Sequence, residues 1–545
     1  MKIDNTKIKR WILPEPIDDK CVKNCKINLA LQKLLLRRGF NIKNDLLEFI
    51  TPLELPNPED HFSELKKATI RLIEACNNNE QIAICGDYDA DGLTSTALLV
   101  EILTKLGANA IPFIPSRNND GYGLNIKMIN NINKAAIKLV VTVDNGISAF
   151  EAIERSNELG IDLIITDHHK IPHIKQEIYA LIHPERCPTY SPYKYLAGVG
   201  IAFMLAKNIC LKNSYDIKNT AANDLFCIGT VADMAPVLGA NRKWLKEYLP
   251  NITNTSNYGI KSIIELLKID YSEITIEDIG FKIAPLINAV GRIDDPKLVF
   301  DLLLNQKQEN SKKLAEKCMA INQQRRRMTT LVEDEAINLA NIELNSGMRF
   351  LVISKKEWHT GIIGIVAARI LDRFNLPTAL ISAANDGLYR GSIRSNDLIK
   401  VNKALQECDE LLVSHGGHSA AGGFTIREEN ISLLKDKLNM IAYKYINENS
   451  LTKVIKPELQ ISLSEINNTF YNQLCILGPF GIGNPKPIFW SRKCLIKEIY
   501  YLNGNHIKFI LSDGNKSIEA LKWNSINYNN NFTRNELVDL AFYIE

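Results

Sequence analysis

The sequence predicts an α/β protein with a parallel-sheet domain, a long helical connector, a second α/β domain and a small C-terminal β-barrel. Three observations lead to this prediction. Short apolar runs alternate with helical stretches from residue 81 to about residue 240, a pattern typical of parallel strands joined by crossover helices. No Gly or Pro interrupts residues 311–344, which predicts one long helix. Short alternating strands separated by Asn-Gly and Asp-Gly turns follow Lys453.

Composition indicates a globular chain of about three or four domains. The 545 residues include 65 Lys and Arg against 62 Asp and Glu, a net charge of +3, and 46% are hydrophobic. These values exclude a disordered or fibrous chain. Eleven cysteines are too dispersed for a disulfide framework, so we expect core thiols. No apolar run approaches a membrane span and residues 1–21 contain no apolar block, so we expect no membrane contact, no secretory signal and a cytoplasmic location.

The rhythm of the sequence divides the chain into five parts. We predict a helical lead-in at 1–80, the parallel-sheet domain at 81–240, the connector at 241–348, the second α/β domain at 349–450 and the barrel at 451–545. The strands expected in the parallel sheet are 82–85, 139–143, 163–165 and 179–182. The strands expected in the barrel are 459–466, 487–502, 506–512, 517–523 and 538–545.

Three carboxylates stand at alternate positions directly after the first predicted strand, at Asp87, Asp89 and Asp91. Carboxylates this close repel one another, so such a loop is typical of a divalent-cation site. A calcium EF-hand is excluded because Leu98 stands where a bidentate Glu is required, and because a strand rather than a helix precedes the loop. For this motif alone, an acidic solvated turn is the alternative.

The next predicted strands also end in polar residues. Asp144 follows the second strand, the run Asp167-His168-His169 follows the third, and Asp233 follows a later apolar run. Ligands bind at the carboxyl ends of strands in an open α/β sheet, so these side chains can converge, although a lone His pair would more often be a surface or capping feature. Asp and His together are the ligands expected for Mn²⁺ or Mg²⁺. There are enough carboxylates for two ions and a bridging carboxylate, which predicts phosphoester hydrolysis.

Ten short motifs are spread along nearly the whole chain. They are GDYDADG (86–92), VDNG (143–146), DHH (167–169), LAGVG (196–200), GTVADMAP (229–236), INAVGR (287–292), WHTGIIGIVAAR (358–369), GSIRS (391–395), GGHSAAGGF (416–424) and PFGIGNP (479–485). On these motifs the sequence closely resembles the DHH phosphoesterase family. The resemblance implies a DHH domain at 81–240, a DHH-associated nucleic-acid-binding domain at 349–450 and an OB-like barrel at 451–545.

The resemblance also implies a set of metal ligands. They are Asp87, Asp89, Asp91, Asp144, His168 and Asp233. Asp89 is expected to bind one ion and Asp91 the other, with Asp144 bridging. His168 and Asp233 complete the coordination of the second ion, and Asp87 is a lesser ligand of the first.

The expected catalytic residues are Asp144, His168 and His169. His169 is expected to face the phosphate or to support a ligand. Related pyrophosphatases carry a His where this chain has Cys85, so we expect water or Asp87 to complete the first ion's coordination. His183 stands where the family has Asn, before a proline; we favour a loop-anchoring role over a further ligand.

Binding of a DNA end is implied by a second group of residues. The expected contacts to the 5′ phosphate are Arg117, Arg292, Ser392, Arg394 and His418. Arg offers bidentate donors to phosphate, and the Gly residues around His418 expose backbone N–H groups. A terminal phosphate carries more charge than an internal diester, so such a cluster would select the 5′ end. A surface ion pair is the commoner fate of a single Arg. We expect residues 325–327 on the solvated face of the long helix.

Aromatic residues of the predicted barrel are candidates for stacking on bases. They are Trp490, Tyr500, Tyr501, Phe509 and Trp523. We expect half or more of them to belong to the barrel core.

The family likeness therefore predicts a metal-dependent 5′→3′ exonuclease that acts on single-stranded DNA, releases 5′-mononucleotides and serves recombination and repair. A helicase and a single-strand-binding protein are candidate partners, and we expect a monomer. One alternative is a DHH phosphodiesterase of short oligonucleotides or cyclic dinucleotides. Another is a DHH scaffold that binds DNA without cutting it.

Overall fold

The computed structural model describes residues 10–18, 27–40, 54–115, 123–173, 175–270, 274–384, 387–447, 454–503, 506–523 and 532–545. The chain forms two compact units. We call Leu47–Gln323 with Cys475–Lys486 the parallel-sheet unit, and Met1–Leu46, Gln324–Leu474 and Pro487–Glu545 the mixed-sheet unit. Described residues of the predicted lead-in fall in both units. The boundaries between the five predicted parts of the chain stay predictions.

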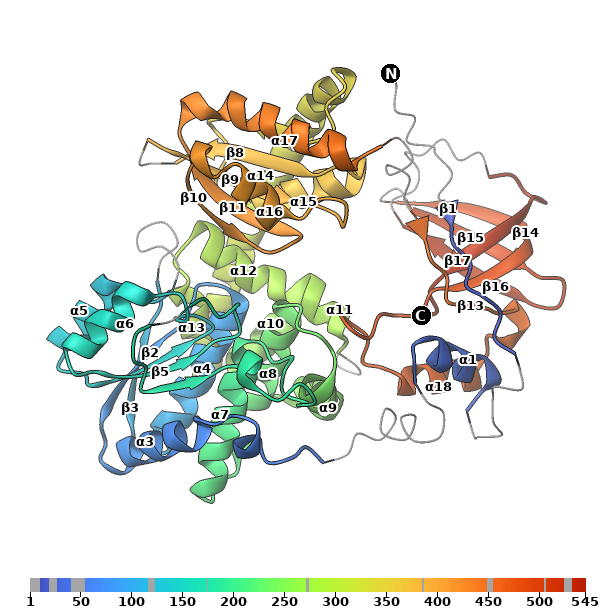
Figure 1. The fold of residues 1–545 in the computed structure, drawn as a ribbon. Coiled ribbons are helices and arrows are strands. Elements are labelled where there is room, and N and C mark those ends of the chain that lie inside the picture. The colour runs from blue at the N-terminus through green and yellow to red at the C-terminus, as the bar shows by residue number, and fades with distance from the viewer. Residues whose placement is uncertain are drawn as a thin grey trace. The chain divides into compact units, whose positions relative to one another are not determined.

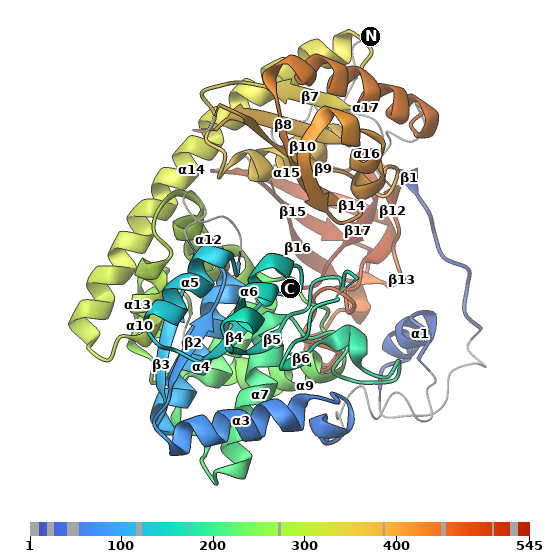
Figure 2. The same ribbon diagram turned by 60° about the vertical axis from the view of Figure 1, so that its left-hand side comes forward.

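The parallel-sheet unit contains five parallel strands in the order β3-β2-β4-β5-β6 (Figures 1 and 2). These are β2 (Gln81–Cys85), β3 (Asn109–Phe113), β4 (Leu139–Val143), β5 (Asp162–Thr166) and β6 (Ala180–Ile182). The four predicted strands are confirmed. The edge strand β3 was missed because it is only half-buried and contains Pro112. The strand order reverses between β2 and β4, and such a switch point opens a crevice at the carboxyl ends of the strands.

Helices cover both faces of this sheet. One face packs on α3 (Leu65–Asn77), α4 (Ala90–Lys105) and α7 (Gly198–Lys212). The other face packs on α5 (Ile126–Lys134) and α6 (Phe150–Glu158). Successive strand residues therefore enter opposite cores, which explains why the strands are apolar throughout rather than alternating.

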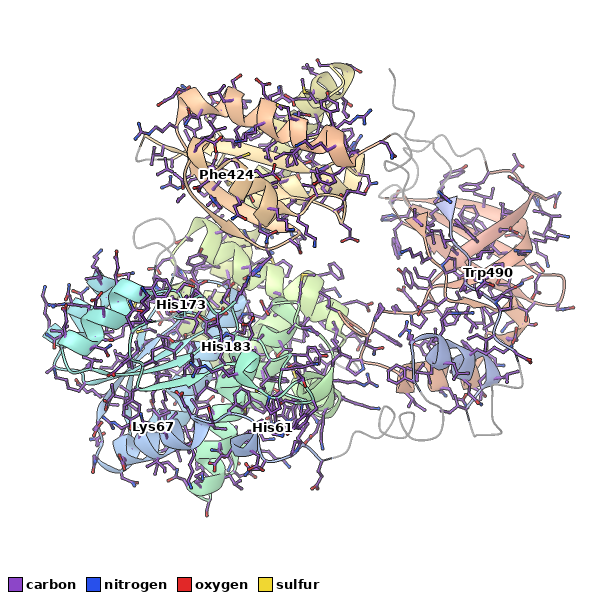
Figure 3. The ribbon with its side chains drawn as sticks, viewed as in Figure 1. His61, Lys67, His173, His183, Phe424 and Trp490 are labelled. Atoms are coloured by element: carbon purple, nitrogen blue, oxygen red, sulfur yellow. The ribbon has the colours of Figure 1, made fainter. Side chains whose placement is uncertain are left out.

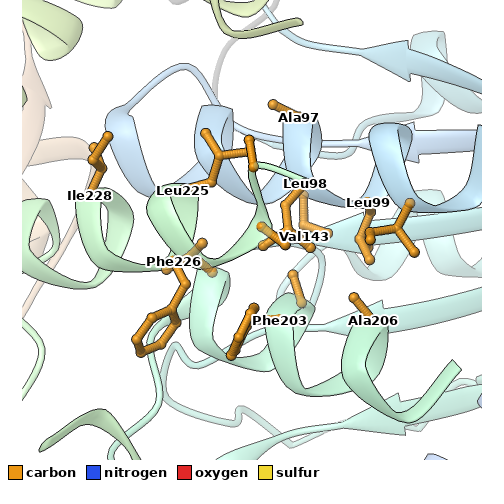
Figure 4. Close-up of a cluster of buried hydrophobic side chains, with 14 of the residues drawn as sticks. Ala97, Leu98, Leu99, Val143, Phe203, Ala206, Leu225, Phe226 and Ile228 are labelled. Carbon is orange, nitrogen blue, oxygen red and sulfur yellow. The ribbon is translucent and has the colours of Figure 1, made fainter. Parts of the chain in front are cut away.

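Close packing of α4, α7 and α8 (Ala222–Ala232) builds the larger core (Figure 4). The rings of Phe203 and Phe226 lie 4.9 Å apart between their centroids. Gly229 permits the close approach, since a Cβ there would lie 2.3 Å from Thr94 Oγ1 and 2.8 Å from Val199 Cγ1. This packing holds the start of α4 and the end of α8 in fixed relation.

The predicted long helix is confirmed as α14 (Gln308–Asn345). It follows α9 (Gly239–Tyr248), α10 (Tyr258–Leu266), α11 (Ile276–Asp278), α12 (Ala284–Ile293) and α13 (Lys297–Leu304). The expectation that residues 325–327 are all solvated was wrong. Arg325 is only 8% exposed, because it faces the packed side of the helix, whereas its two neighbours are exposed.

The first sheet of the mixed-sheet unit has the order β10-β11-β9-β8-β7. Its elements are β7 (Leu351–Ser354), α15 (Ile363–Phe374), β8 (Thr378–Ala383), β9 (Tyr389–Arg394), α16 (Val401–Glu407), β10 (Leu412–Gly417), β11 (Ala421–Ile426) and α17 (Ile431–Tyr445). Only β7 and β8 pair in parallel, so the second α/β domain contains a mixed sheet.

The C-terminal strands form the predicted small barrel-like sheet. Its elements are β13 (Leu459–Gln460), α18 (Asn468–Ile476), β14 (Phe489–Leu502), β15 (His506–Ser512), β16 (Ser517–Lys522) and β17 (Leu537–Phe542). The expected strand at 459–466 is shorter than predicted, because Ser462 and Glu465 form a capping box around a 3₁₀ turn. The Asp513-Gly514 hairpin turn is confirmed, and Gly504 of the other turn lies outside the described residues.

Two short elements from the start of the chain also belong to the mixed-sheet unit. Strand β1 (Arg10–Trp11) pairs with β12 (Val454–Ile455). Helix α1 (Leu29–Arg37) lies within the predicted helical lead-in, and Arg38 forms an ion pair with Glu458 at 2.8 Å.

Fewer barrel aromatics are buried than predicted. Trp490 (labelled in Figure 3) and Phe509 are buried, but Tyr500, Tyr501 and Trp523 are 47%, 65% and 59% exposed. The reason is that the ends of β14 and β16 extend beyond the buried cluster of the barrel. Three of the five candidate rings are thus exposed.

Within the described part of the chain, no helix has both the length and the apolar character needed to cross a lipid bilayer.

The packing at Gly229 provides a stability test. We expect Gly229→Ala to lower the free energy of unfolding by about 1–3 kcal/mol, because the added methyl group overlaps Thr94 and Val199. Denaturant unfolding measures the change. Gly280→Ala is the matched control, since a Cβ there lies 3.7 Å from its nearest neighbour, Val231 Cγ1. Equal stability of the two variants would contradict the packing argument.

Candidate metal centre

The acidic loop after β2 is folded tightly over its own first carboxylate. Asp89 caps helix α4, and its Oδ1 accepts a hydrogen bond from Gly92 N at 3.1 Å. Asp87 is 1% exposed beneath the loop, and a Cβ at Gly92 would lie 2.6 Å from Asp87 N. The loop therefore requires glycine at position 92. Asp89 is the most accessible of the three loop carboxylates.

Asp91 is held by the N-terminus of helix α7. Its Oδ2 accepts from Gly198 N at 2.8 Å and its Oδ1 from Val199 N at 2.7 Å. These N–H groups are left unpaired by the helix itself and favour a negative charge. A Cβ at Gly198 would lie 2.5 Å from Asp144 Cβ, so glycine is needed for this approach. This is the structural role of the LAGVG motif.

Asp144 lies between the other acidic groups. It has a left-handed backbone conformation, with φ of 61°, and is 2% exposed. A non-glycine residue in that region is strained, and such strain is concentrated at functional sites. Its Oδ1 lies 3.0 Å from His168 Nε2.

Asp167 holds both histidines in place. Its carboxylate accepts from Ile147 N at 2.9 Å, His168 N at 2.7 Å and His169 N at 3.0 Å. It also bonds to His169 Nδ1 at 2.8 Å. His168 Nε2 lies 3.8 Å from Asp91 Oδ2, and its Nδ1 lies 3.9 Å from Asp233 Oδ2. The first residue of the DHH run is thus a positioning group, a role that sequence analysis missed.

Three overlapping groups of side chains have the geometry of a cation site. The described residues contain Asp87 with Asp89 and Asp144; Asp91 with His168 and Asp233; and Asp144 with His168 and His169. Within each group the ligand atoms lie within 4.8 Å of one another. Asp144 and His168 are each shared by two groups. All six predicted ligands fall in these groups, and the shared residues make the groups adjacent.

Burial and mutual repulsion shift the protonation of these groups. Burial and the nearby Asp233 raise the pKa of Asp91 to about 8. Burial and Asp89 raise the pKa of Asp233 to about 7, and burial with Asp91 raises the pKa of Asp144 well above its usual value. Burial lowers the pKa of His168, which favours the neutral imidazole that binds metals. Without a cation these carboxyl groups therefore tend to hold protons, and a bound cation would stabilise their charged form.

The pKa of His169 is shifted upward, opposite to the shift of His168. Burial alone would lower its pKa, but the hydrogen bond to the Asp167 carboxylate and the surrounding carboxylates raise it. The contact of 2.8 Å between His169 Nδ1 and Asp167 Oδ1 also orients the ring.

Two unusual positions of the sequence are now explained. Cys85 is fully buried among the apolar side chains of the α5 and α6 face, so it is not available as a ligand. His183 (labelled in Figure 3) accepts from Glu185 N at Nδ1, 3.1 Å away, and its Nε2 donates to the His169 carbonyl at 2.7 Å. The loop-anchoring prediction for His183 is confirmed.

Helix α12 packs directly on the acidic loop. Asn288 Oδ1 accepts from Ala90 N at 2.8 Å, and a Cβ at Gly291 would lie 2.1 Å from Tyr88 O. Arg292 is in the last turn of this helix and is half-buried. Sequence analysis did not identify Asn288 as a support of the loop, because its partner is 198 positions away. Arg117 lies outside the described residues.

The other predicted phosphate contacts belong to the mixed-sheet unit. Ser392 and Arg394 lie on β9, and Arg394 Nη1 donates to Ser392 Oγ at 3.1 Å. Both side chains lie beside Gly364 in the first turn of α15, where a Cβ would be 2.9 Å from Ser392 Oγ. His418 is exposed in the turn after β10. Their role in phosphate binding stays a prediction.

Comparison with known proteins identifies three domains. The model of the DHH family, N-terminal domain, matches residues 81–230, that of the DHHA1 domain matches 347–444, and that of the RecJ OB domain matches 458–545. The chain is 32% identical to the single-stranded-DNA-specific exonuclease RecJ of Escherichia coli, over 88% of this chain and 86% of that protein. The chain belongs to the RecJ family.

Other members of the RecJ family are also similar to this chain in sequence or fold. The chain is 31% identical to RecJ of Bacillus subtilis over 94% of its own length, and spans 66% of that relative. Its fold is similar to the crystal structure of RecJ in complex with Mn²⁺ from Thermus thermophilus, with a TM-score of 0.82. The two sequences are 26% identical, and the match covers 98% of this chain and 79% of that one. A RecJ structure with Mg²⁺ from the same organism has a TM-score of 0.76. The acidic and His donors of this chain fit either ion.

The raised pKa values predict how stability depends on pH. In the cation-free protein, Asp91 and Asp233 hold protons more tightly when folded than when unfolded, so its unfolding free energy falls as pH rises through about 7 and 8. Cation binding requires the deprotonated carboxylates. We therefore expect the increase in Tm caused by Mn²⁺, relative to EDTA, to grow with pH over this interval. A Tm increase that shrinks with rising pH in thermal melts would contradict the assignment.

Proposed function

We propose that the chain is a metal-dependent exonuclease that hydrolyses single-stranded DNA in the 5′→3′ direction, releasing 5′-mononucleotides in recombination and repair in the cytoplasm. The observation that carries this proposal is the convergence of six predicted ligands into adjacent groups that share Asp144 and His168. The RecJ relatives carry the name single-stranded-DNA-specific exonuclease, which supports the same substrate for this chain.

The ligand groups suggest how two ions are held. Asp87 and Asp89 would bind the first, Asp91, His168 and Asp233 would bind the second, and Asp144 would serve both. Two such ions supply an activated water nucleophile and neutralise the charge that develops on the phosphate during displacement.

Backbone and side-chain groups of the protein position the residues that would bind the ions and the phosphate. The α7 N–H groups fix the orientation of the Asp91 carboxylate, and Asp167 accepts a hydrogen bond from the backbone N–H of His168. His169, with its raised pKa, is suited to hold a proton at Nε2 and to donate a hydrogen bond to a phosphate oxygen. Rigid elements position every one of these side chains, as efficient catalysis requires.

DNA recognition would use both units. The predicted contacts to the 5′ phosphate remain Arg117, Arg292, Ser392, Arg394 and His418. The exposed rings of Tyr500, Tyr501 and Trp523 offer stacking surfaces for bases. We further propose that the chain acts as a monomer, with a helicase and a single-strand-binding protein as partners.

The two alternatives have less support. A phosphodiesterase of dinucleotides has no need of an OB domain, and the RecJ OB domain model matches residues 458–545. A scaffold that only binds DNA has no need of the complete ligand set, and all six ligands are present.

Removal of the shared carboxylate tests the proposal. We expect wild-type protein with Mn²⁺ to degrade 5′- and 3′-labelled single strands progressively from the 5′ end, and to cleave a dinucleotide more slowly. Asp144→Ala should abolish turnover while retaining the fold, because both ions lose a ligand. Asp162→Asn, which removes only the charge paired with Arg71, is the control. Digestion solely from the 3′ end would refute the polarity, and an active Asp144→Ala variant would refute the bridging role.

The positioning role of Asp167 is tested through His169. We expect Asp167→Asn to lower the rate by about 10-fold and to move the alkaline limb of the pH–rate profile to lower pH, because the charge that raises the His169 pKa is lost. The double variant Asp167→Asn/His169→Gln should lose less activity than the product of the two single losses. Additive losses would show that Asp167 acts independently of His169.

A further inference from the structure

Residues 475–486 come from the C-terminal half of the chain but belong to the parallel-sheet unit. The residues before and after this segment belong to the mixed-sheet unit. The segment contains the PFGIGNP motif at 479–485, to which the chemistry described so far assigns no role.

The side chain of Asn484 closes this segment into a compact loop. Its Nδ2 donates to Leu477 O at 3.0 Å and to Pro479 O at 2.9 Å. The backbones of Gly481 and Asn484 exchange hydrogen bonds of 2.9 and 3.1 Å. Asn484 is only 3% exposed. The loop conformation thus depends on one buried amide group.

Helix α9 binds the same carbonyl group that Asn484 binds. Arg242 Nη1 donates to Leu477 O at 3.0 Å, and Arg242 is 5% exposed. Burial lowers the pKa of the guanidinium to about 10. A buried guanidinium is costly unless it is hydrogen-bonded, so this contact fastens the loop firmly to the unit.

The loop also contacts residues 233–238, which connect α8 to α9. Val237 N donates to Ile482 O at 2.6 Å. The loop backbone packs closely on side chains of this connection, since a Cβ at Gly481 would lie 2.6 Å from Val237 Cγ2, and one at Gly483 would lie 2.9 Å from Leu238 Cδ1. The segment therefore limits where the 233–238 connection can run.

Asp233 is the first residue of that connection. It caps the end of α8, and the following Met234 has a left-handed backbone with φ of 60°. On the side of α9, Asn241 Nδ2 donates to Pro236 O at 3.0 Å. The connection is thus held by Asn241 and by the 475–486 segment, while the Asp233 carboxylate lies 3.9 Å from His168 Nδ1.

We propose that the 475–486 segment braces the Asp233 connection and that Asn484 is a positioning residue for the cation held by Asp91, His168 and Asp233. Without the Asn484 amide, the loop loses the hydrogen bonds that fix its conformation. Ile482 O is then no longer held beside Val237 N, and the Asp233 carboxylate is no longer fixed beside His168. This inference rests on the proposed metal centre. Residues that position a metal ligand typically contribute about 10–100-fold to metal affinity.

Mn²⁺ titration of the full-length Asn484→Ala variant tests the brace, by calorimetry and by the electron paramagnetic resonance signal of free Mn²⁺. We expect one of two sites to weaken by about 10-fold, equivalent to about 1.4 kcal/mol. Nuclease activity should require correspondingly more Mn²⁺ and recover at saturation, because no ligand is lost. Gly481→Ala, which pushes on Val237, should have the same effect without removing a hydrogen-bond donor.

Asn439→Ala is the matched control. Asn439 is also 3% exposed and also bonds to backbone groups, accepting from Arg349 N and Phe350 N and donating to Phe350 O, but it lies in the mixed-sheet unit. We expect it to lower Tm and leave Mn²⁺ affinity unchanged.

The outcomes separate this inference from the proposed function. Folded Asn484→Ala and Gly481→Ala proteins with wild-type affinity, or an equal loss in Asn439→Ala, would overturn the brace. Failure of the wild-type protein to bind Mn²⁺, or unchanged binding in Asp233→Ala, would instead overturn the metal centre.

Discussion

Electrostatic repulsion among buried carboxylates is the constraint on which this structure depends. Asp87, Asp91 and Asp144 are almost fully enclosed and lie close to Asp89 and Asp233. Only protons or cations can neutralise such a group, so its charge state and its chemistry are linked. Among the described residues, fixed hydrogen-bond donors surround these carboxylates. The backbone N–H groups at the start of α7 are the clearest example. A site stabilised in this way remains able to exchange protons for metal ions.

The architecture supplies these groups from elements that cannot move independently. The acidic loop and Asp144 follow β2 and β4, the two strands at which the sheet order reverses, and the histidines follow β5. The α4, α7 and α8 core joins the strand ends to Asp233 at the end of α8. Glycines at positions 92, 198 and 229 allow the close approaches that the site requires, because a side chain at any of them would overlap a neighbour. The same rule appears in the C-terminal segment, where Gly481 and Gly483 contact the Asp233 connection.

Much of the site could be predicted because most of its predicted ligands occur directly after strands. An acid or His that follows a parallel strand must lie at one edge of the sheet, and five of the six predicted ligands do so; the sixth, Asp233, reaches the others from the end of helix α8. The supports of those ligands could not be predicted in the same way. Asn288 reaches Ala90 across 198 positions, and Asn484 acts on a loop some 250 positions earlier in the chain. Asp167 is a different case: its motif was recognised, but its role depends on hydrogen-bond directions that no pattern records.

Local pattern determined four of the five strands of the parallel sheet, the uninterrupted α14 and the Asp513-Gly514 turn, because each depends on periodicity or on neighbouring residues. Tertiary structure alone decided which groups are buried. It placed Arg325 against the packed side of α14, left Tyr500 and Tyr501 exposed, and turned Cys85 into the core rather than the site. Burial, and the pKa shifts that follow from it, depend on which distant segments cover a residue. That information is a property of the folded chain and is absent from any short stretch of sequence.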